Sequence, residues 1–191
     1  PNGEWAVRQS GDTIYLSGGG ASPAGDRPFL DSFDLATRKS RRLFRSGKDA
    51  FESFVAFAGA STQELLTWRQ TPADPPNLML RTLGKGVRNA PAGEATVAST
   101  HRAITQIPDP IPAVRAIKKR LVTYKRKDGV DLSFTLYTPP DYKEGTRVPA
   151  TLYAYPLDYA NAKTAGEVSG SEQYFTRLRN HQLLLLSGYA I

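Results

Sequence analysis

A repeat of strand-like segments constrains the fold of this 191-residue chain more than any other feature of its sequence. In the first 107 residues, short runs of β-branched and aromatic residues alternate with turn-forming residues, a pattern typical of β-strands. Trp5 and Phe54 are 49 residues apart, as are Phe29 and Leu78. The predicted strands are 4–8, 13–17, 29–35 and 40–45, then 53–58, 64–70, 77–83 and 101–107. Four strands in about 50 residues is the period of a β-propeller blade, so residues 1–107 are predicted to form two antiparallel blades.

The last predicted strand departs from this spacing. Ile104 follows Leu43 by 61 residues, so we expect an insertion within residues 84–93. No helix longer than two turns is predicted before residue 83. Because two blades cannot close a propeller, a small β-sandwich with accidental spacing is the alternative interpretation.

Composition excludes several classes of site. The chain has no cysteine, which rules out disulfides, thiolate zinc sites and a cysteine nucleophile. No apolar run approaches the roughly 18 residues of a membrane-spanning helix. No helix is expected after the glycines at 18–20, so they do not indicate a phosphate site, and Asp31 and Asp34 lack the partners of a metal site. We therefore predict no cofactor, no metal and no membrane partner, and the sequence does not indicate a cellular compartment.

The net charge of +7 raises the alternative of a basic nucleic-acid-binding β domain. The lysines and arginines are scattered through the strand-like segments instead of being clustered with aromatic residues. We interpret them as a solvated basic surface and predict no nucleic-acid partner.

A change of character follows residue 107. Three prolines within residues 108–112 predict an extended connector, taken as a linker over 108–118. Next, a Lys-Asp-Gly turn lies between the strand-like residues 120–126 and 130–137, and this pattern predicts a β-hairpin. Residues 150–155 are predicted to be a buried central strand and 174–186 a helix, after which Gly188 turns the chain into a new strand. A hairpin, a strand, a helix and a further strand are typical of the opening of an α/β sheet, here residues 119–191.

Both ends of the sequence suggest a piece of a longer protein. It begins at Pro1 without an initiator methionine and ends on the apolar residues Tyr189, Ala190 and Ile191. We expect the remainder of the parent polypeptide to be a partner of this segment, whereas its oligomeric state is not indicated.

Several stretches resemble the prolyl oligopeptidase family of serine peptidases, and more closely its glutamyl-endopeptidase-like branch. These stretches are 14–23, 26–31, 121–130, 152–156 and 166–171. The resemblance implies that residues 1–107 are the last blades of a β-propeller and that 119–191 are the N-terminal part of an α/β-hydrolase domain. It also implies hydrolysis of peptide bonds in short peptides. A non-catalytic propeller interaction module is the alternative.

The catalytic triad implied by the resemblance is not expected within this chain. No G-x-S-x-G motif occurs, so the nucleophilic serine and its aspartate and histidine partners are expected elsewhere in the parent protein. His101 and His181 are not predicted to be catalytic bases, and Asp158 is given no role. The isolated chain is therefore predicted to have no peptidase activity.

One catalytic position is implied within the chain. The resemblance places Tyr155 at the end of the third hydrolase strand, where its hydroxyl would help to bind the oxyanion. Tyr153 lies two residues earlier and competes for the role. The alternatives for Tyr155 are a core aromatic or a hydroxyl bonded to the next loop.

Overall fold

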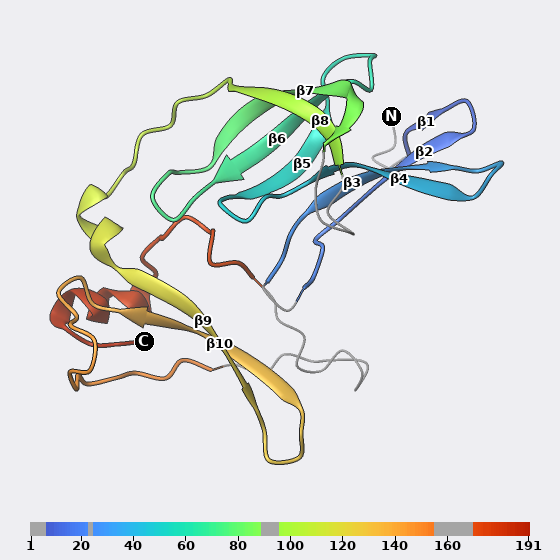
Figure 1. Cartoon of the computed structure of the whole chain (residues 1–191). Helices are drawn as coiled ribbons and strands as arrows, with labels where there is room; N and C mark the ends of the chain where they lie inside the picture. The colour runs from blue at the N-terminus through green and yellow to red at the C-terminus, as the bar shows by residue number, and fades with distance from the viewer. Residues whose placement is uncertain (1–6, 23–24, 89–95, 155–169) are drawn as a thin grey trace, which may run out of the picture. The chain divides into compact units, whose positions relative to one another are not determined.

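The computed structural model describes residues 7–22, 25–88, 96–154 and 170–191 (Figure 1). It divides into two compact units. The first unit comprises residues 1–20, 27–69 and 76–107, and the second comprises 21–26, 70–75 and 108–191.

Two four-stranded sheets make up the first unit. The first sheet is antiparallel and has the order β1-β2-β3-β4, with bounds Gln9–Ser10, Thr13–Gly18, Phe29–Asp34 and Lys39–Arg45. The second sheet has the order β5-β6-β7-β8, with bounds Phe51–Phe57, Glu64–Gln70, Asn77–Arg88 and Thr96–Ala103. The β6–β7 and β7–β8 pairs are antiparallel. The prediction of two four-stranded sets is confirmed, and no helix occurs in the described residues before 83.

The first and last predicted strands are placed differently in the structure. Part of the predicted strand 4–8 lies outside the described residues, and the observed β1 is Gln9–Ser10. The predicted strand 101–107 is shifted, because β7 continues to Arg88 and its partner β8 begins at Thr96. Residues 104–107 instead form individual hydrogen bonds, such as that from the Ile107 amide to the side chain of Asn77.

Each sheet contains a register shift that repositions side chains. In β4, Arg42 pairs with Asp31 and Phe44 with Leu30, so Leu43 is an extra residue. Such bulges bend a strand and change which face its side chains occupy. Leu43 and its neighbour Phe44 are consequently both buried.

The register shift in the second sheet involves three residues of β7. Leu83 pairs with Ser99 and Val87 with Val97, which leaves residues 84–86 opposite Ala98 alone. The insertion predicted within 84–93 therefore begins inside a strand.

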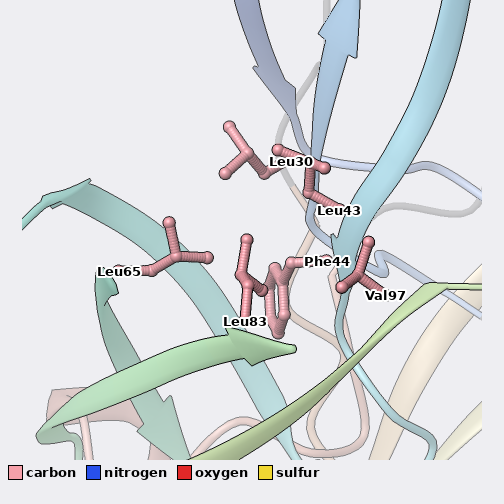
Figure 2. Packing of buried hydrophobic residues seen from close by; sticks show 6 residues of the cluster. All are labelled: Leu30, Leu43, Phe44, Leu65, Leu83 and Val97. Carbon is pink, nitrogen blue, oxygen red and sulfur yellow. The ribbon is translucent and has the colours of Figure 1, made fainter. Parts of the chain in front are cut away.

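Apolar side chains from both sheets form one core in the first unit. Figure 2 shows Leu30, Leu43, Phe44, Leu65, Leu83 and Val97. Leu30 and Leu65 are almost completely buried. Truncating such a leucine to alanine typically costs about 2–5 kcal/mol, so this cluster contributes substantially to the stability of the two-sheet arrangement.

The second unit is built around a β-hairpin. β9 (Lys118–Lys125) and β10 (Asp131–Thr138) pair antiparallel over their whole length, which confirms the predicted hairpin. Gly129 in the connecting turn has φ +87°, a conformation that glycine adopts without strain. The expected extended connector is only partly extended, because Pro112–Ala116 form the 3₁₀-helix η1. Burial of Val114 and of Ile117 just after it accounts for this turn of helix.

The C-terminal residues extend the hairpin into a larger sheet. Ile191 exchanges two backbone hydrogen bonds with Tyr137 of β10, and Ala190 forms a parallel bridge with Ala150. Residues 190–191 therefore lie between β10 and residues 149–151.

The predicted buried strand 150–155 is wrong in its extent. Beyond the bridge at Ala150, residues 151–154 have no strand conformation, and Leu152 is 88% exposed. A strand requires a hydrogen-bonded neighbour along its length. Ala190 is such a neighbour for residues 149–151.

The predicted helix 174–186 is replaced by a shorter one. The 3₁₀-helix η2 spans Asn180–Ser187 and ends at Gly188, which has φ +84°. Before it, the Phe175 amide donates to the side chain of Gln70, and the Thr176 amide donates to the carbonyl of Pro72. These contacts hold residues 175–176 against residues 70–75, and residues 175–179 have no helical conformation. No helix in the described ranges could cross a membrane.

Candidate functional site

The direction of the chain in the second unit indicates where a site would form. Ala150 and Ala190 lie in parallel segments, so the chain leaves both positions toward the same edge of the sheet. In open α/β sheets, ligands bind outside the carboxyl ends of such strands. Tyr155, the predicted oxyanion donor, follows Ala150 by five residues and lies outside the described residues.

Tyr153 and His181 form an aromatic pair near this edge. Their rings are parallel within 7°, with centroids 4.2 Å apart. Tyr153 is 58% exposed, whereas His181 is half-buried near the start of η2. The sequence indicated no contact between these residues, which are 28 positions apart. The stack places a phenol and an imidazole together where 151–154 leave the sheet.

A second group of contacts fixes residues 170–174 within the second unit. The Gly170 amide donates to the Asp26 carboxylate over 2.8 Å, and the Asp26 amide donates to the Gly170 carbonyl over 2.7 Å. Glu172 accepts from the amide of Leu121 in β9. These contacts set the start of the segment that leads to η2.

Lys119 anchors the same segment from β9. Its ammonium group donates to the carbonyl of Tyr174. Burial lowers the pKa of Lys119 to about 8, against the opposing charge of Glu172, while Arg115 adds to the lowering. Burial also raises the pKa of the Tyr174 hydroxyl, and the Asp26 carboxylate acts in the same direction. Both groups are thus partly desolvated.

Three other polar residues considered in the sequence, His101, Asp31 and Asp34, belong to the first unit. His101 lies exposed on β8, and its pKa is lowered by desolvation and by the charge of Arg81. Asp31 forms an ion pair with Arg42, and Asp34 accepts hydrogen bonds from Thr37. Asp158 lies outside the described residues. Within those residues, no three histidine or acidic side chains are grouped so as to hold a metal ion.

Two curated proteins are similar to nearly the whole chain. Both are named probable glutamyl endopeptidase, chloroplastic, one from Arabidopsis thaliana and one from Oryza sativa subsp. japonica. Each is 31% identical, over 179 and 183 residues respectively, which is 92% and 93% of this chain. The chain spans 18% and 19% of the two relatives. No protein-family model matches it.

Solved structures of AtxE2 isopeptidase are also similar in part. The match to the apo structure covers 73% of this chain and 18% of the isopeptidase chain, with 17% identity and a TM-score of 0.44. A second structure of this isopeptidase covers 75%, with 16% identity and a TM-score of 0.43. TM-scores this low do not establish a common fold. The sequence comparison shows that the chain is similar to a segment of two proteins named as peptidases, and this segment is about one fifth of the length of each.

Proposed function

We propose that this chain is part of a serine peptidase of the prolyl oligopeptidase family, in its glutamyl-endopeptidase-like branch. The observation that carries the proposal is the strand order of the second unit. An antiparallel hairpin is followed by residues 190–191 and then by the parallel residues 149–151. An antiparallel edge on a sheet that continues with parallel strands is common in α/β folds. This order supports residues 119–191 as the opening of an α/β-hydrolase domain.

The proposal gives the other segments corresponding roles. Residues 1–107 are the last blades of a β-propeller, supported by two consecutive four-stranded sheets. Residues 108–118 are the linker, and the remainder of the parent polypeptide supplies the other blades and the catalytic Ser, Asp and His. Peptides are the substrates, and the names of the two relatives make glutamyl bonds the first to test.

Tyr155 is the residue of this chain that we propose to act in catalysis. It follows Ala150 by five residues in the sequence, and the chain leaves Ala150 toward the carboxyl edge, where a peptide carbonyl would be attacked. A tyrosine hydroxyl fixed there donates a hydrogen bond to the carbonyl oxygen as it becomes negatively charged. Such a contact stabilises the transition state more than the bound substrate, so it raises kcat.

The test is a pair of variants in the full-length protein. Loss of one oxyanion donor lowers kcat by roughly 10²–10³, so Tyr155→Phe should lose this much hydrolysis of a fluorogenic glutamyl peptide. Tyr153→Phe is the matched control and should nearly retain the wild-type kcat. The proposed role of Tyr155 is contradicted if Tyr155→Phe keeps full kcat, or if its loss follows a loss of folded protein measured by thermal unfolding.

A further inference from the structure

A hollow of about 440 Å³ lies within the first unit, lined by residues from both of its sheets. Its volume falls in the range of about 300–1,000 Å³ that is typical of small-molecule sites. Lining residues come from β2, β3, β4, β7 and β8 and from the β5–β6 connection. The hollow is thus formed by regular structure on most sides.

The floor of the hollow is apolar. Leu43, Leu83 and Val97 line it and belong to the core cluster of Figure 2, and Tyr15 packs against the same cluster. Gly84 and six polar residues complete the lining, the latter being Thr13, Ser32, Arg41, Thr62, Gln63 and Lys85. A ligand that fits this lining has an apolar body and a polar group.

Strand register explains how the two cations reach the hollow. Tyr15 pairs with Ser32 and Ser32 with Arg41, so these side chains form one row across the first sheet. Lys85 is the middle one of the three β7 residues that lie opposite Ala98 alone, where the register shift redirects side chains. One cation therefore comes from each sheet.

Both cations are available to an anion. Arg41 and Lys85 are exposed, and neither side chain forms an ion pair with any described residue. The unit does contain neutralised arginines, because Arg42 pairs with Asp31 and Arg81 pairs with Glu52. None of the described residues that line the hollow is an aspartate or a glutamate.

We propose that this hollow binds a small organic carboxylate, with its apolar arm on the floor and its charge between Arg41 and Lys85. An arginine fork binds a carboxylate through two parallel hydrogen bonds, while lysine adds a point charge. The hydroxyls of Thr13 and Thr62, which also line the hollow, are further donors. The carboxylate can belong to a free acid or to the C-terminus of a peptide.

The experiment is calorimetric titration of the full-length protein with 3-phenylpropionate. Two probes test the chemistry, since 3-phenylpropionamide lacks the charge and acetate lacks the apolar body. We expect 3-phenylpropionate to bind more tightly than either, with an affinity that falls as salt rises. The proposal is overturned if 3-phenylpropionate and 3-phenylpropionamide bind with equal affinity. It is also overturned if neither 3-phenylpropionate nor the peptide probe described below binds.

Charge-removing variants locate the site. Each of Arg41→Gln and Lys85→Gln should weaken binding by about two- to fivefold, as expected for exposed ion pairs. Lys48→Gln removes an exposed lysine of the same unit that does not line the hollow, and it should leave the affinity unchanged. Binding that all three variants retain in full would place the ligand elsewhere and overturn the proposal.

A blocked peptide ending in phenylalanine distinguishes the two sources of the carboxylate. A peptide terminus is identified as a ligand if this peptide binds, if its C-terminal amide does not bind, and if Arg41→Gln weakens the binding of the peptide. Binding of 3-phenylpropionate alone identifies a free acid. Either result supports the carboxylate site, and binding of the peptide amide as tightly as the acid contradicts it.

Discussion

Ile191 and Tyr137 exchange two backbone hydrogen bonds, one of 2.7 Å from the Tyr137 amide and one of 3.0 Å from the Ile191 amide. The preceding residue, Ala190, donates to the carbonyl of Pro149 and accepts from the amide of Thr151. Two segments separated by about 40 positions thus become neighbours in one sheet.

The first prediction concerns the bridge at Ala190. Ala190→Pro removes the amide that donates to Pro149, and an unsatisfied partner typically costs about 1–3 kcal/mol. Ala190→Gly keeps the amide and should cost only about 0.5–1 kcal/mol. Urea denaturation of the full-length protein measures both losses. If the proline variant is no less stable than the glycine variant, the bridge is not formed.

The second prediction concerns a buried ion pair in the second sheet. Glu52 pairs with Arg81 over 2.8 Å and accepts from the hydroxyl of Thr67 over 2.6 Å. Both charged side chains are nearly buried, so Glu52→Ala leaves an uncompensated guanidinium and should cost about 3–5 kcal/mol.

The exposed pair of Asp131 with Lys125 is the control for Glu52→Ala. Both of its side chains are about two-thirds exposed, at 72% and 68%. Asp131→Ala should therefore cost no more than about 1 kcal/mol in the same denaturation experiment. Similar losses for the two variants would show that burial does not govern the Glu52 interaction.

The third prediction is a dependence of stability on pH. The pKa of Lys119 falls from 10.5 to about 8 on folding, mainly because of burial. Between these values the unfolded chain retains a proton that the folded chain has lost, so this residue makes stability rise with pH across the window. Below about pH 8 the amine is charged in both states and the cost of burying the charge is fully present.

Lys119→Met isolates this effect. The stability of the variant relative to wild type should fall as the pH rises from 7.5 to 10. Urea titrations at intervals of about one pH unit measure this fall. Lys118→Met removes the exposed neighbouring lysine and serves as the control. A stability difference for Lys119→Met that is constant over this range would contradict the burial of a charged amine.

The parts of the fold that were predictable depend on local patterns. The strand Asp131–Thr138 carries its own alternation of apolar residues, and the turn at Gly129 carries its own conformational requirement. The conformation of residues 174–179 could not be predicted in this way. The partners of Phe175 and Thr176 are Gln70 and Pro72, about 100 positions earlier, so this segment makes contacts that its apolar spacing does not indicate.

The candidate site was predictable only as a position in the sequence. The resemblance implied Tyr155, while the structure adds that Tyr153 stacks on His181. Nothing in the local sequence of either residue signals this contact, because it depends on how the segments 151–154 and 180–187 fold together. The hollow beside Arg41 and Lys85 likewise depends on two register shifts. The repeat spacing predicted an insertion near the shift in β7, but it did not indicate the extra residue Leu43 in β4.

The most direct test of the proposed function is labelling of the full-length protein with a fluorophosphonate, followed by peptide mapping. This reagent modifies serines that are activated as nucleophiles, and G-x-S-x-G is absent from these 191 residues. We predict stoichiometric modification of one serine outside this segment, and no labelling of the 191-residue chain alone. Modification of Ser17, Ser169, Ser171 or Ser187, or no modification of the full-length protein, would contradict the account.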